Sequence, residues 1–303
     1  DVVAKDSAIA LVEAESPSQI RDEFEFSGLS VVCTNPQTDS YADYRCDFEL
    51  WEVDSGFMMY IGCNVTYSKF FDDGTLRTFL TYGIDRQTLV DDNYGGLALP
   101  TTLPISPMSP YYSKSLAANY DYDEMRFIDA ASKFRVPTND KGVPRTLQLL
   151  VNSDDSARLR CARDIAATLT ELGLACETVE SPTSVYEARL QAANYDIYLG
   201  ITKLPTTADL SEFYRPWGEM SWGGLANETI YNMVNQSLAD RGNYYNLHKL
   251  VADDGRIIPV MAGYYAIYAK RGVLSDLNPA RDNVFYYTLG KTMESSKVAT
   301  QFS

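Results

Sequence analysis

Residues 145–180 carry the pattern that most restricts the fold of this chain. Apolar residues alternate along 147–151 and predict a buried strand, and a stripe at helical spacing over 159–172 predicts a helix after it. Gly173 suits the left-handed cap that ends such a helix, before a second strand at 175–179. A strand, a helix and a strand in this order form a parallel pair with a right-handed crossover, so we expect an α/β domain.

Further elements are expected on both sides of this unit. Pro17 can open a helix that runs to Phe26 and is ended by Gly28. Apolar runs and periodicity predict strands at 7–11, 29–33, 57–63, 195–200 and 257–260, and helices at 121–134, 185–193, 227–239 and 245–252. From about Met293 the sequence reads as a frayed tail.

Charge and hydropathy exclude some classes of partner. The chain has 41 acidic and 26 basic residues, a net charge of -15, which argues against a phosphate-binding surface and therefore against nucleic acid. The longest apolar run, residues 257–269, is interrupted by Pro259 and Gly263. It is shorter than the roughly 20 residues that cross a bilayer, so we predict no membrane-spanning helix.

A helix followed by a glycine- and proline-rich loop stands out at residues 76–110. Leu76, Phe79, Leu80 and Ile84 form one apolar stripe, and we expect the charged side chains Arg77, Asp85 and Arg86 on the wet face or paired with each other. The glycines of Tyr94-Gly95-Gly96 end the helical stretch, and the prolines at 100, 104, 107 and 110 prevent its resumption.

This segment resembles the hallmark of the family 5 extracellular solute-binding proteins, the peptide- or nickel-type substrate-binding proteins of ABC importers. The matching motifs are Tyr82-Gly83-Ile84-Asp85-Arg86, then Gly96-Leu97-Ala98-Leu99-Pro100. Later motifs agree: Tyr195 to Gly200 resembles the family's "Y-D-x-x-x-x-G" strand, and residues 169–174 resemble its "L-x-x-I-G-I" turn. One departure is Ser27-Gly28-Leu29-Ser30, where the family commonly has an acidic turn.

The resemblance implies a type II periplasmic-binding-protein fold, with lobe two complete and lobe one represented in part. We expect residues 1–75 to be partial lobe one, 76–262 the α/β lobe two, and 263–303 the return strands to lobe one with the C-terminal tail. The match is to the later, C-terminal part of a family member. Since closure of two lobes holds the ligand in this family, we expect this chain alone to bind ligand weakly or not at all.

Residues for catalysis or for a metal are not grouped in the sequence. His248 is the single histidine, in a helical stretch, and we interpret it as a packing or surface residue. The pairs Asp91-Asp92 and Asp253-Asp254 are interpreted as solvated faces rather than acid/base dyads, because sequence neighbours point apart on a helix. No familiar catalytic motif occurs, so we predict a protein that is not an enzyme and needs no cofactor.

Five cysteines are scattered along the chain without a C-x-x-C pair, so neither a zinc knuckle nor a redox motif is indicated. Because their count is odd, at least one thiol has no partner within the monomer. We interpret Cys161 and Cys176 as small buried hydrophobic residues rather than a disulfide.

The loop from Ile201 to Trp222 is the candidate ligand site, because pockets of α/β domains commonly lie beyond the carboxyl ends of strands. Aromatic rings would pack on a ligand there, and charged groups would meet its ammonium or carboxylate. In peptide-binding relatives an aspartate soon after the matching strand pairs with the peptide amino terminus. Asp209 is the nearest here, nine residues beyond Gly200, and a helix cap at 210–213 is an equal alternative. The predicted ligand-binding residues are Lys203, Asp209, Trp217, Glu219, Trp222 and Tyr264.

The resemblance implies an extracellular receptor that captures a small peptide or similar solute and delivers it to the permease subunits of an ABC importer. It also implies an extracellular location, either periplasmic or as a membrane-anchored lipoprotein whose lipid anchor this chain lacks. Two alternatives stay open: a ligand-sensing domain of a regulator with the same fold, and a hydrolase with a carboxylate pair in a pocket.

Overall fold

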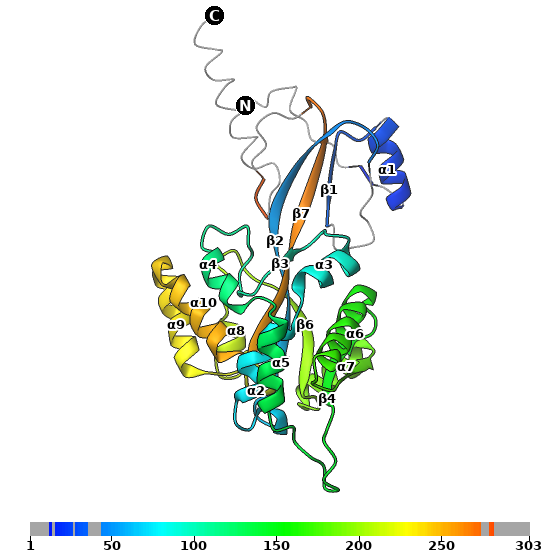
Figure 1. Cartoon of the computed structure of the whole chain (residues 1–303). Helices are drawn as coiled ribbons and strands as arrows, with labels where there is room; N and C mark the ends of the chain where they lie inside the picture. Colours follow the sequence, from blue (N-terminus) through cyan, green and yellow to red (C-terminus); the bar gives the residue numbers. More distant parts are fainter. Residues whose placement is uncertain (1–11, 14–15, 27, 36–43, 274–278, 282–303) are drawn as a thin grey trace, which may run out of the picture. The chain divides into compact units, whose positions relative to one another are not determined.

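A computed structural model describes residues 12–13, 16–26, 28–35, 44–273 and 279–281 of the chain (Figure 1). Its contacts divide the chain into two compact units, residues 1–55 with 263–303, and residues 56–262. Two long strands, β2 (Phe48–Cys63) and β7 (Ile257–Lys270), contribute residues to both units. The lobe boundaries expected after residues 75 and 262 stay a prediction.

The first unit contains helix α1 (Pro17–Phe26) and strand β1 (Val31–Thr34). Pro17 opens α1 as expected, since its fixed φ suits the first helical position. β1 pairs antiparallel with the last part of β7, from Val31 opposite Ala269 to Thr34 opposite Ala266. The rings of Phe24 and Tyr268 both pack against Tyr44, with centroids 4.6 and 4.9 Å away, and the three form an aromatic core. The strand expected at 7–11 and the tail from Met293 lie outside the described residues.

The second unit is built on a mixed sheet with the strand order β7-β2-β6-β4-β5, and β3 (Leu99–Pro100) pairs with β7. β4 (Leu147–Asn152) lies parallel to both β5 (Cys176–Ser181) and β6 (Ile197–Lys203), whereas β2 and β6 are antiparallel. Helix α6 (Ser156–Glu171) connects β4 to β5. The predicted strand-helix-strand unit is therefore confirmed, including Gly173, whose φ of +100° only glycine adopts without strain.

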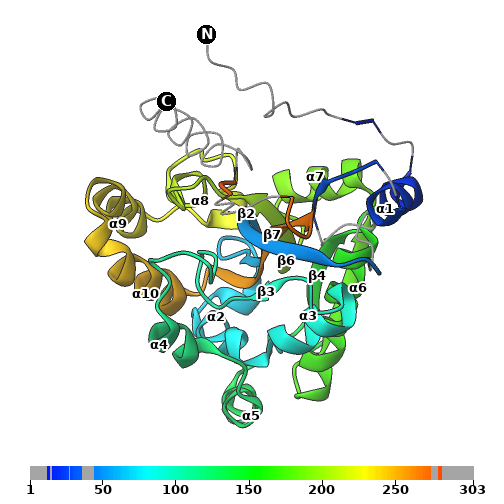
Figure 2. The ribbon, with the colours of Figure 1, turned by 90° about the horizontal axis from the view of Figure 1, so that it is seen from above.

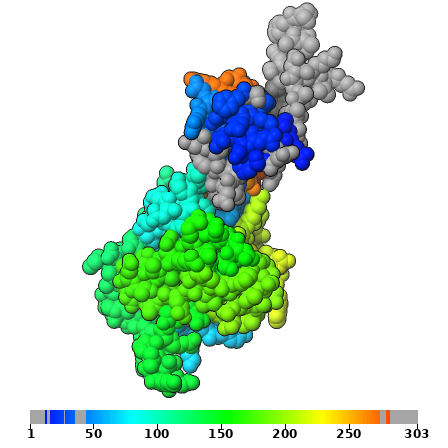
Figure 3. Space-filling model, turned by 90° about the vertical axis from the view of Figure 1, so that its right-hand side faces the viewer, coloured from blue at the N-terminus to red at the C-terminus, as the bar shows by residue number. Residues whose placement is uncertain are grey.

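Helices cover both faces of this sheet, and successive side chains along a strand point to opposite faces. Leu149 and Val151 belong to one buried cluster with side chains of α2, α3, α5 and α6, and Leu150 belongs to a second cluster with side chains of α7 to α10. Figure 2 shows α3 and α6 on one side of the strands and α9 and α10 on the other, and in Figure 3 the segment with α6 and α7 covers the face toward the viewer. The remaining helices are α2 (Thr75–Phe79), α3 (Arg86–Tyr94), α4 (Lys114–Ala117), α5 (Glu124–Lys133), α7 (Thr183–Gln191), α8 (Ser211–Tyr214), α9 (Glu228–Ala239) and α10 (Tyr244–Asp254), with 3-10 turns at Lys69–Phe71, Leu80–Gly83, Ala118–Tyr120, Trp222–Gly224 and Arg241–Asn243.

The stretch after residue 75 differs from the single amphipathic helix that the sequence predicts. α2 ends at Phe79, a 3-10 turn follows, and the Asp85 side chain caps a new helix by accepting from the Thr88 N–H at 3.1 Å. α3 ends at Tyr94, and Gly95 has the left-handed φ of +57° that the glycine motif predicts. The prediction that Arg86 lies on the wet face is wrong, because the break in the helix turns it inward, where it is 1% exposed.

The structure also shows the surroundings of the cysteines and of the acidic pair at the end of α10. All five cysteines are free thiols; Cys161 is buried and Cys176 half-buried. Asp254 is not on a solvated face: it lies between Arg77 and Arg256, at 3.3 and 3.1 Å, with a side chain 13% exposed. The expectation that Asp254 lies on a solvated face is therefore wrong. The expectation that the side chains of Asp253 and Asp254 point apart is confirmed.

Helix α9 offers a test of local stability. The Asn227 side chain accepts a hydrogen bond from the Ile230 N–H at 3.2 Å and satisfies a donor of the first turn. Changing Asn227→Ala removes this cap, so we expect the free energy of unfolding to fall by about 1 kcal/mol in urea denaturation. Asn227→Ser, which can form the same bond, should recover most of the loss, and equal losses for both variants would contradict a capping role.

Candidate functional site

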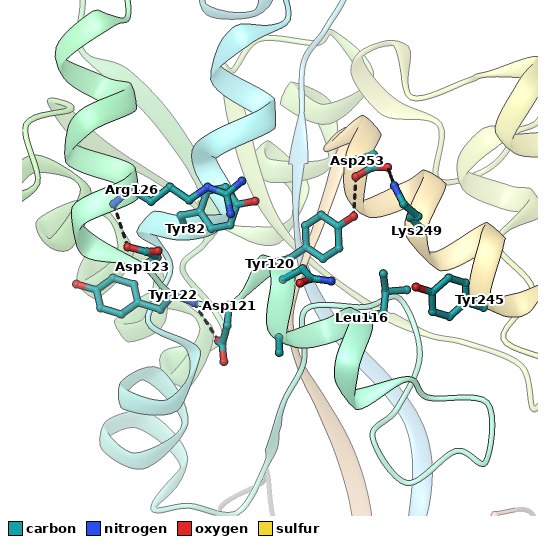
Figure 4. A pocket seen from close by; sticks show the side chains of 12 residues that line it. Tyr82, Leu116, Tyr120, Asp121, Tyr122, Asp123, Arg126, Tyr245, Lys249 and Asp253 are labelled. Carbon is teal, nitrogen blue, oxygen red and sulfur yellow. Dashed lines mark hydrogen bonds and ion pairs between the residues drawn. The ribbon is translucent and has the colours of Figure 1, made fainter.

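A polar cavity of about 530 Å³ opens in the second unit where the 3-10 turn before α5 faces α10 (Figure 4). We call it the tyrosine pocket. It is lined by Tyr82, Leu116, Ala118, Asn119, Tyr120, Asp121, Tyr122, Asp123, Arg126, Tyr245, Lys249 and Asp253. These residues come from three segments that are far apart in the sequence, so only the folded chain brings them together.

Ring and charge contacts order one wall of the tyrosine pocket. The Arg126 guanidinium lies 3.8 Å from the ring centre of Tyr82, a cation–π geometry. Asp123 caps α5 by accepting from the Arg126 N–H at 2.9 Å. Arg126 is thereby held at the first turn of the helix with its charged end on the pocket surface.

The opposite wall centres on Asp253. The Tyr120 hydroxyl donates to its carboxylate at 2.6 Å, and Lys249 forms an ion pair with it. Burial opposes ionisation of Asp253, but the hydrogen bonds from Lys249 and Tyr120 outweigh it and hold its pKa below the usual value. Burial and the same carboxylate raise the pKa of Tyr120. The pocket therefore presents neutral phenols and both signs of charge, which suits a polar solute.

The loop predicted from the sequence lies elsewhere in the same unit. Lys203 is the exposed last residue of β6. The Asp209 carboxylate accepts from the Ser211 backbone N–H at 2.8 Å and from its hydroxyl at 2.6 Å, so it orders the start of α8. Glu219 is exposed, and Trp222 is half-buried and packs against the second core cluster.

Trp217 is the most exposed large side chain of this loop, at 95%, and it has a left-handed φ of +61°. The Gly218 N–H donates to the Arg215 carbonyl at 3.1 Å, so residues 215–218 form a tight turn with Pro216 at its second position. A non-glycine residue at the third position is strained. Beside this turn, Arg215 makes a bidentate ion pair with Glu212, at 3.0 and 2.7 Å.

The loop is tied to the strand that precedes it. The Thr202 hydroxyl lies 3.2 Å from the Met220 sulfur, which fixes the return of the loop beside the end of β6. Five of the six predicted residues therefore belong to one strand end and its loop. Tyr264 belongs to the other unit and is 6% exposed, in β7.

The six predicted residues do not line the tyrosine pocket. Neither periodicity nor motifs predicted this pocket. The signal in the sequence was the run Tyr120-Asp121-Tyr122-Asp123, which we interpreted as the start of a helix. Among the described residues, no group of three or more histidine, cysteine, aspartate or glutamate side chains could hold a metal ion. No described helix is long and apolar enough to cross a membrane.

Comparison with solved structures identifies the fold as that of substrate-binding proteins. The chain is similar to the oligopeptide-binding protein AppA from Bacillus subtilis, solved with a nonapeptide, with a TM-score of 0.64 at 16% identity over 89% of this chain and 57% of that one. It is similar to the ABC transporter substrate-binding protein CtaP from Listeria monocytogenes, with a TM-score of 0.68 at 13% identity over 88% of this chain and 56% of that one. It is also similar to NikA from Brucella suis, solved with Fe(III)-EDTA, with a TM-score of 0.66 at 15% identity over 89% of this chain and 59% of that one.

The sequence profile of the bacterial extracellular solute-binding proteins, family 5 (middle part), matches residues 16–224. The chain belongs to this family, whose members bind peptides or nickel for ABC importers and are not enzymes. The family and the type II periplasmic-binding-protein fold expected from the sequence are confirmed. The chain spans less than two thirds of the length of each of the three solved structures. A search of curated proteins found no match.

Proposed function

We propose that this protein is an extracellular receptor that captures a peptide and delivers it to the permease subunits of an ABC importer. The observation that carries the proposal is the family match over residues 16–224, together with an exposed aromatic residue, Trp217, on the loop beyond the end of β6. Capture without chemical change needs a shaped surface with aromatic and charged groups and no reacting residue. We further propose an extracellular location, as a periplasmic protein or through a lipid anchor.

The chemistry of His248 favours a peptide over a bare nickel ion. Solved structures similar to this chain hold a nonapeptide or Ni(L-His). His248, the single histidine of this chain, is fully buried beside Tyr244, with ring centroids 5.6 Å apart. Its imidazole therefore presents no nitrogen to a ligand at the surface, and imidazole is a preferred nickel donor.

The ligand residues proposed are Lys203, Asp209, Trp217, Glu219, Trp222 and Tyr264. Trp217 offers the largest apolar surface, because its indole is exposed and its backbone is fixed before any ligand arrives. The turn that carries the indole is formed before binding, so the loop backbone loses little conformational entropy when a ligand binds, which favours affinity. Asp209 is engaged with Ser211, so its contribution would be through the shape of the loop as well as through charge.

Peptide binding tests the proposal. The protein as its gene encodes it is titrated with nonapeptides of mixed sequence in isothermal calorimetry, and we expect dissociation constants on the order of 1 µM. Trp217→Ala should weaken binding by about tenfold or more, since it removes a large aromatic contact. The fold should be unaffected, because the indole is 95% exposed.

Met125→Ala is the matched control, because Met125 is also largely exposed, at 74%, but lies on α5 away from the loop. It should bind peptide like the wild type. Equal affinities of the wild type and Trp217→Ala would rule out the loop as the ligand site, and the absence of any peptide binding would overturn the proposed function itself.

A further inference from the structure

A second, smaller cavity of about 190 Å³ adjoins the tyrosine pocket, and both are lined by Ala118 and Asp121. We call it the Arg86 cavity. Its walls come from the start of α3, the segment after β3 and the start of α4, and they are Arg86, Pro100, Thr101, Thr102, Tyr112, Lys114, Ala117, Ala118 and Asp121. The volume exceeds the roughly 30 Å³ that one water molecule occupies several times over, so a small solute fits.

Arg86 is the buried charge of this cavity. Its guanidinium donates from Nε to the Pro259 carbonyl at 2.8 Å, from Nη1 to the Thr81 and Ile84 carbonyls at 3.2 Å, and from Nη2 to the Thr81 hydroxyl at 2.8 Å. A guanidinium has five N–H donors, and these bonds use four. One N–H of Nη2 takes part in none of these bonds, and the side chain lines the cavity.

The four acceptors are all neutral oxygens. Among the described residues no carboxylate accepts a hydrogen bond from Arg86, although the negative charge of Asp121 acts on it from the cavity wall. Burial lowers the pKa of the guanidinium to about 10, so it keeps its charge at neutral pH. Buried charges in proteins are normally paired with an opposite charge, and this one has only dipoles as direct partners.

A second cation faces the same space. Lys114 lines the cavity from the first turn of α4 and is exposed, and Tyr112 adds a half-buried phenol. Two cations and one carboxylate leave the walls with one net positive charge. The hydroxyls of Thr101 and Thr102 donate to backbone carbonyls, and the Tyr112 phenol is hydrogen-bonded to these two threonines. The donors that can reach a ligand are therefore those of Arg86 and Lys114.

We propose that the Arg86 cavity is a binding site for a small carboxylate anion, with one oxygen on the free N–H of Arg86 and the other facing Lys114. A monoanion matches the single net positive charge, whereas Asp121 repels a dianion such as phosphate. Acetate and propionate are the simplest members of this class, and a free amino acid presents the same group. The site is separate from the loop proposed for peptide capture, and the inference does not depend on that function.

Titration with sodium acetate tests the site. Ionic strength is held constant with sodium chloride, so that screening does not change. We expect a saturable rise of the thermal midpoint by about 2–5 °C at 100 mM acetate, for a dissociation constant on the order of 1–10 mM. The Nε–Hε resonance of Arg86, protected by burial, should shift along the same saturation curve in a nitrogen–proton correlation spectrum.

Two exposed wall residues give variants with opposite expected effects. Lys114→Met should weaken acetate binding by about tenfold, because it removes one of the two cations. Asp121→Asn should tighten it several-fold, because it removes the repelling charge while its side-chain oxygen can still accept the Tyr122 N–H, as Asp121 does at 3.0 Å.

The outcomes separate the alternatives. Weaker acetate binding in Lys114→Met and tighter binding in Asp121→Asn, with a matching shift of the Arg86 resonance, support the site. A non-saturable response, or one that is the same in both variants, would show that Arg86 is a structural link only. Phosphate binding as tightly as acetate would overturn the carboxylate class.

Discussion

Replacing Arg86 by methionine is expected to lower the free energy of unfolding by about 3–5 kcal/mol. The guanidinium joins the turn before α3 to β7 through the carbonyls of Thr81, Ile84 and Pro259. Methionine fills much of the same volume but donates nothing, so the Ile84 and Pro259 carbonyls lose the Arg86 donor, and the Thr81 carbonyl keeps only the Ile84 N–H at 3.4 Å. Each unpaired buried acceptor costs about 1–3 kcal/mol, and partial relaxation keeps the total below the sum.

Urea denaturation followed by circular dichroism measures this effect. Gln87→Met is the matched control, since Gln87 is the next residue of α3 and is exposed, with its amide on Asp91. We expect that variant within about 0.5 kcal/mol of the wild type. The free energy of unfolding of Arg86→Lys should lie between those of Arg86→Met and Gln87→Met. An ammonium keeps the charge but cannot donate to the same set of oxygens as the planar guanidinium. A loss below about 1 kcal/mol for Arg86→Met would contradict the linking role.

Stability should also depend on pH through His248. Burial lowers the pKa of this imidazole to about 4 from its ordinary value of 6.5, and neither ring nitrogen has a hydrogen-bond partner among the described residues. The unfolded chain therefore takes up the proton first. The contribution to stability is complete above pH 6.5 and is lost as the pH falls toward 4, by about 2 kcal/mol at pH 5 and about 3 kcal/mol at pH 4.

His248→Leu should remove this dependence, because leucine fits the apolar surroundings and does not titrate. Urea denaturation of both proteins between pH 4 and 7.5 gives two curves, and the carboxylates common to both cancel in their difference. The chain has no other histidine, so the difference belongs to position 248. If the two proteins show the same pH dependence, the folded protein binds a proton at His248 as readily as the unfolded chain does, and the prediction is wrong.

Much of the fold could be predicted because its signals are local. The helix from Pro17, the strand-helix-strand unit with Gly173, and the helix expected over 121–134, which the structure has as Glu124–Lys133, each depend on residues within a few positions of one another. Such patterns reflect backbone preferences and side-chain periodicity, which do not require knowledge of distant segments. The family hallmark is local as well, and it was enough to predict the class of protein.

The candidate sites were harder to predict from the sequence than the fold. The sequence singled out the loop after β6 from its place at a strand end, and the structure shows that its Trp217 is exposed while Asp209 is occupied with Ser211. The two cavities gave no comparable signal. The tyrosine pocket unites Tyr82 and residues 116–126 with residues of α10, and the Arg86 cavity unites Arg86 with residues 100–102 and 112–121. No spacing in the chain relates these segments.

By itself the sequence determined the family, the α/β class and the approximate positions of several helices, because these follow from short-range periodicity, capping residues and glycines. Only the tertiary structure decided which charges are buried. Asp253 and Asp254 are neighbours, yet one meets Tyr120 and Lys249 and the other Arg77 and Arg256. Whether a charge faces water depends on what packs against it, and for Arg86 that is the carbonyl of Pro259, 173 positions away.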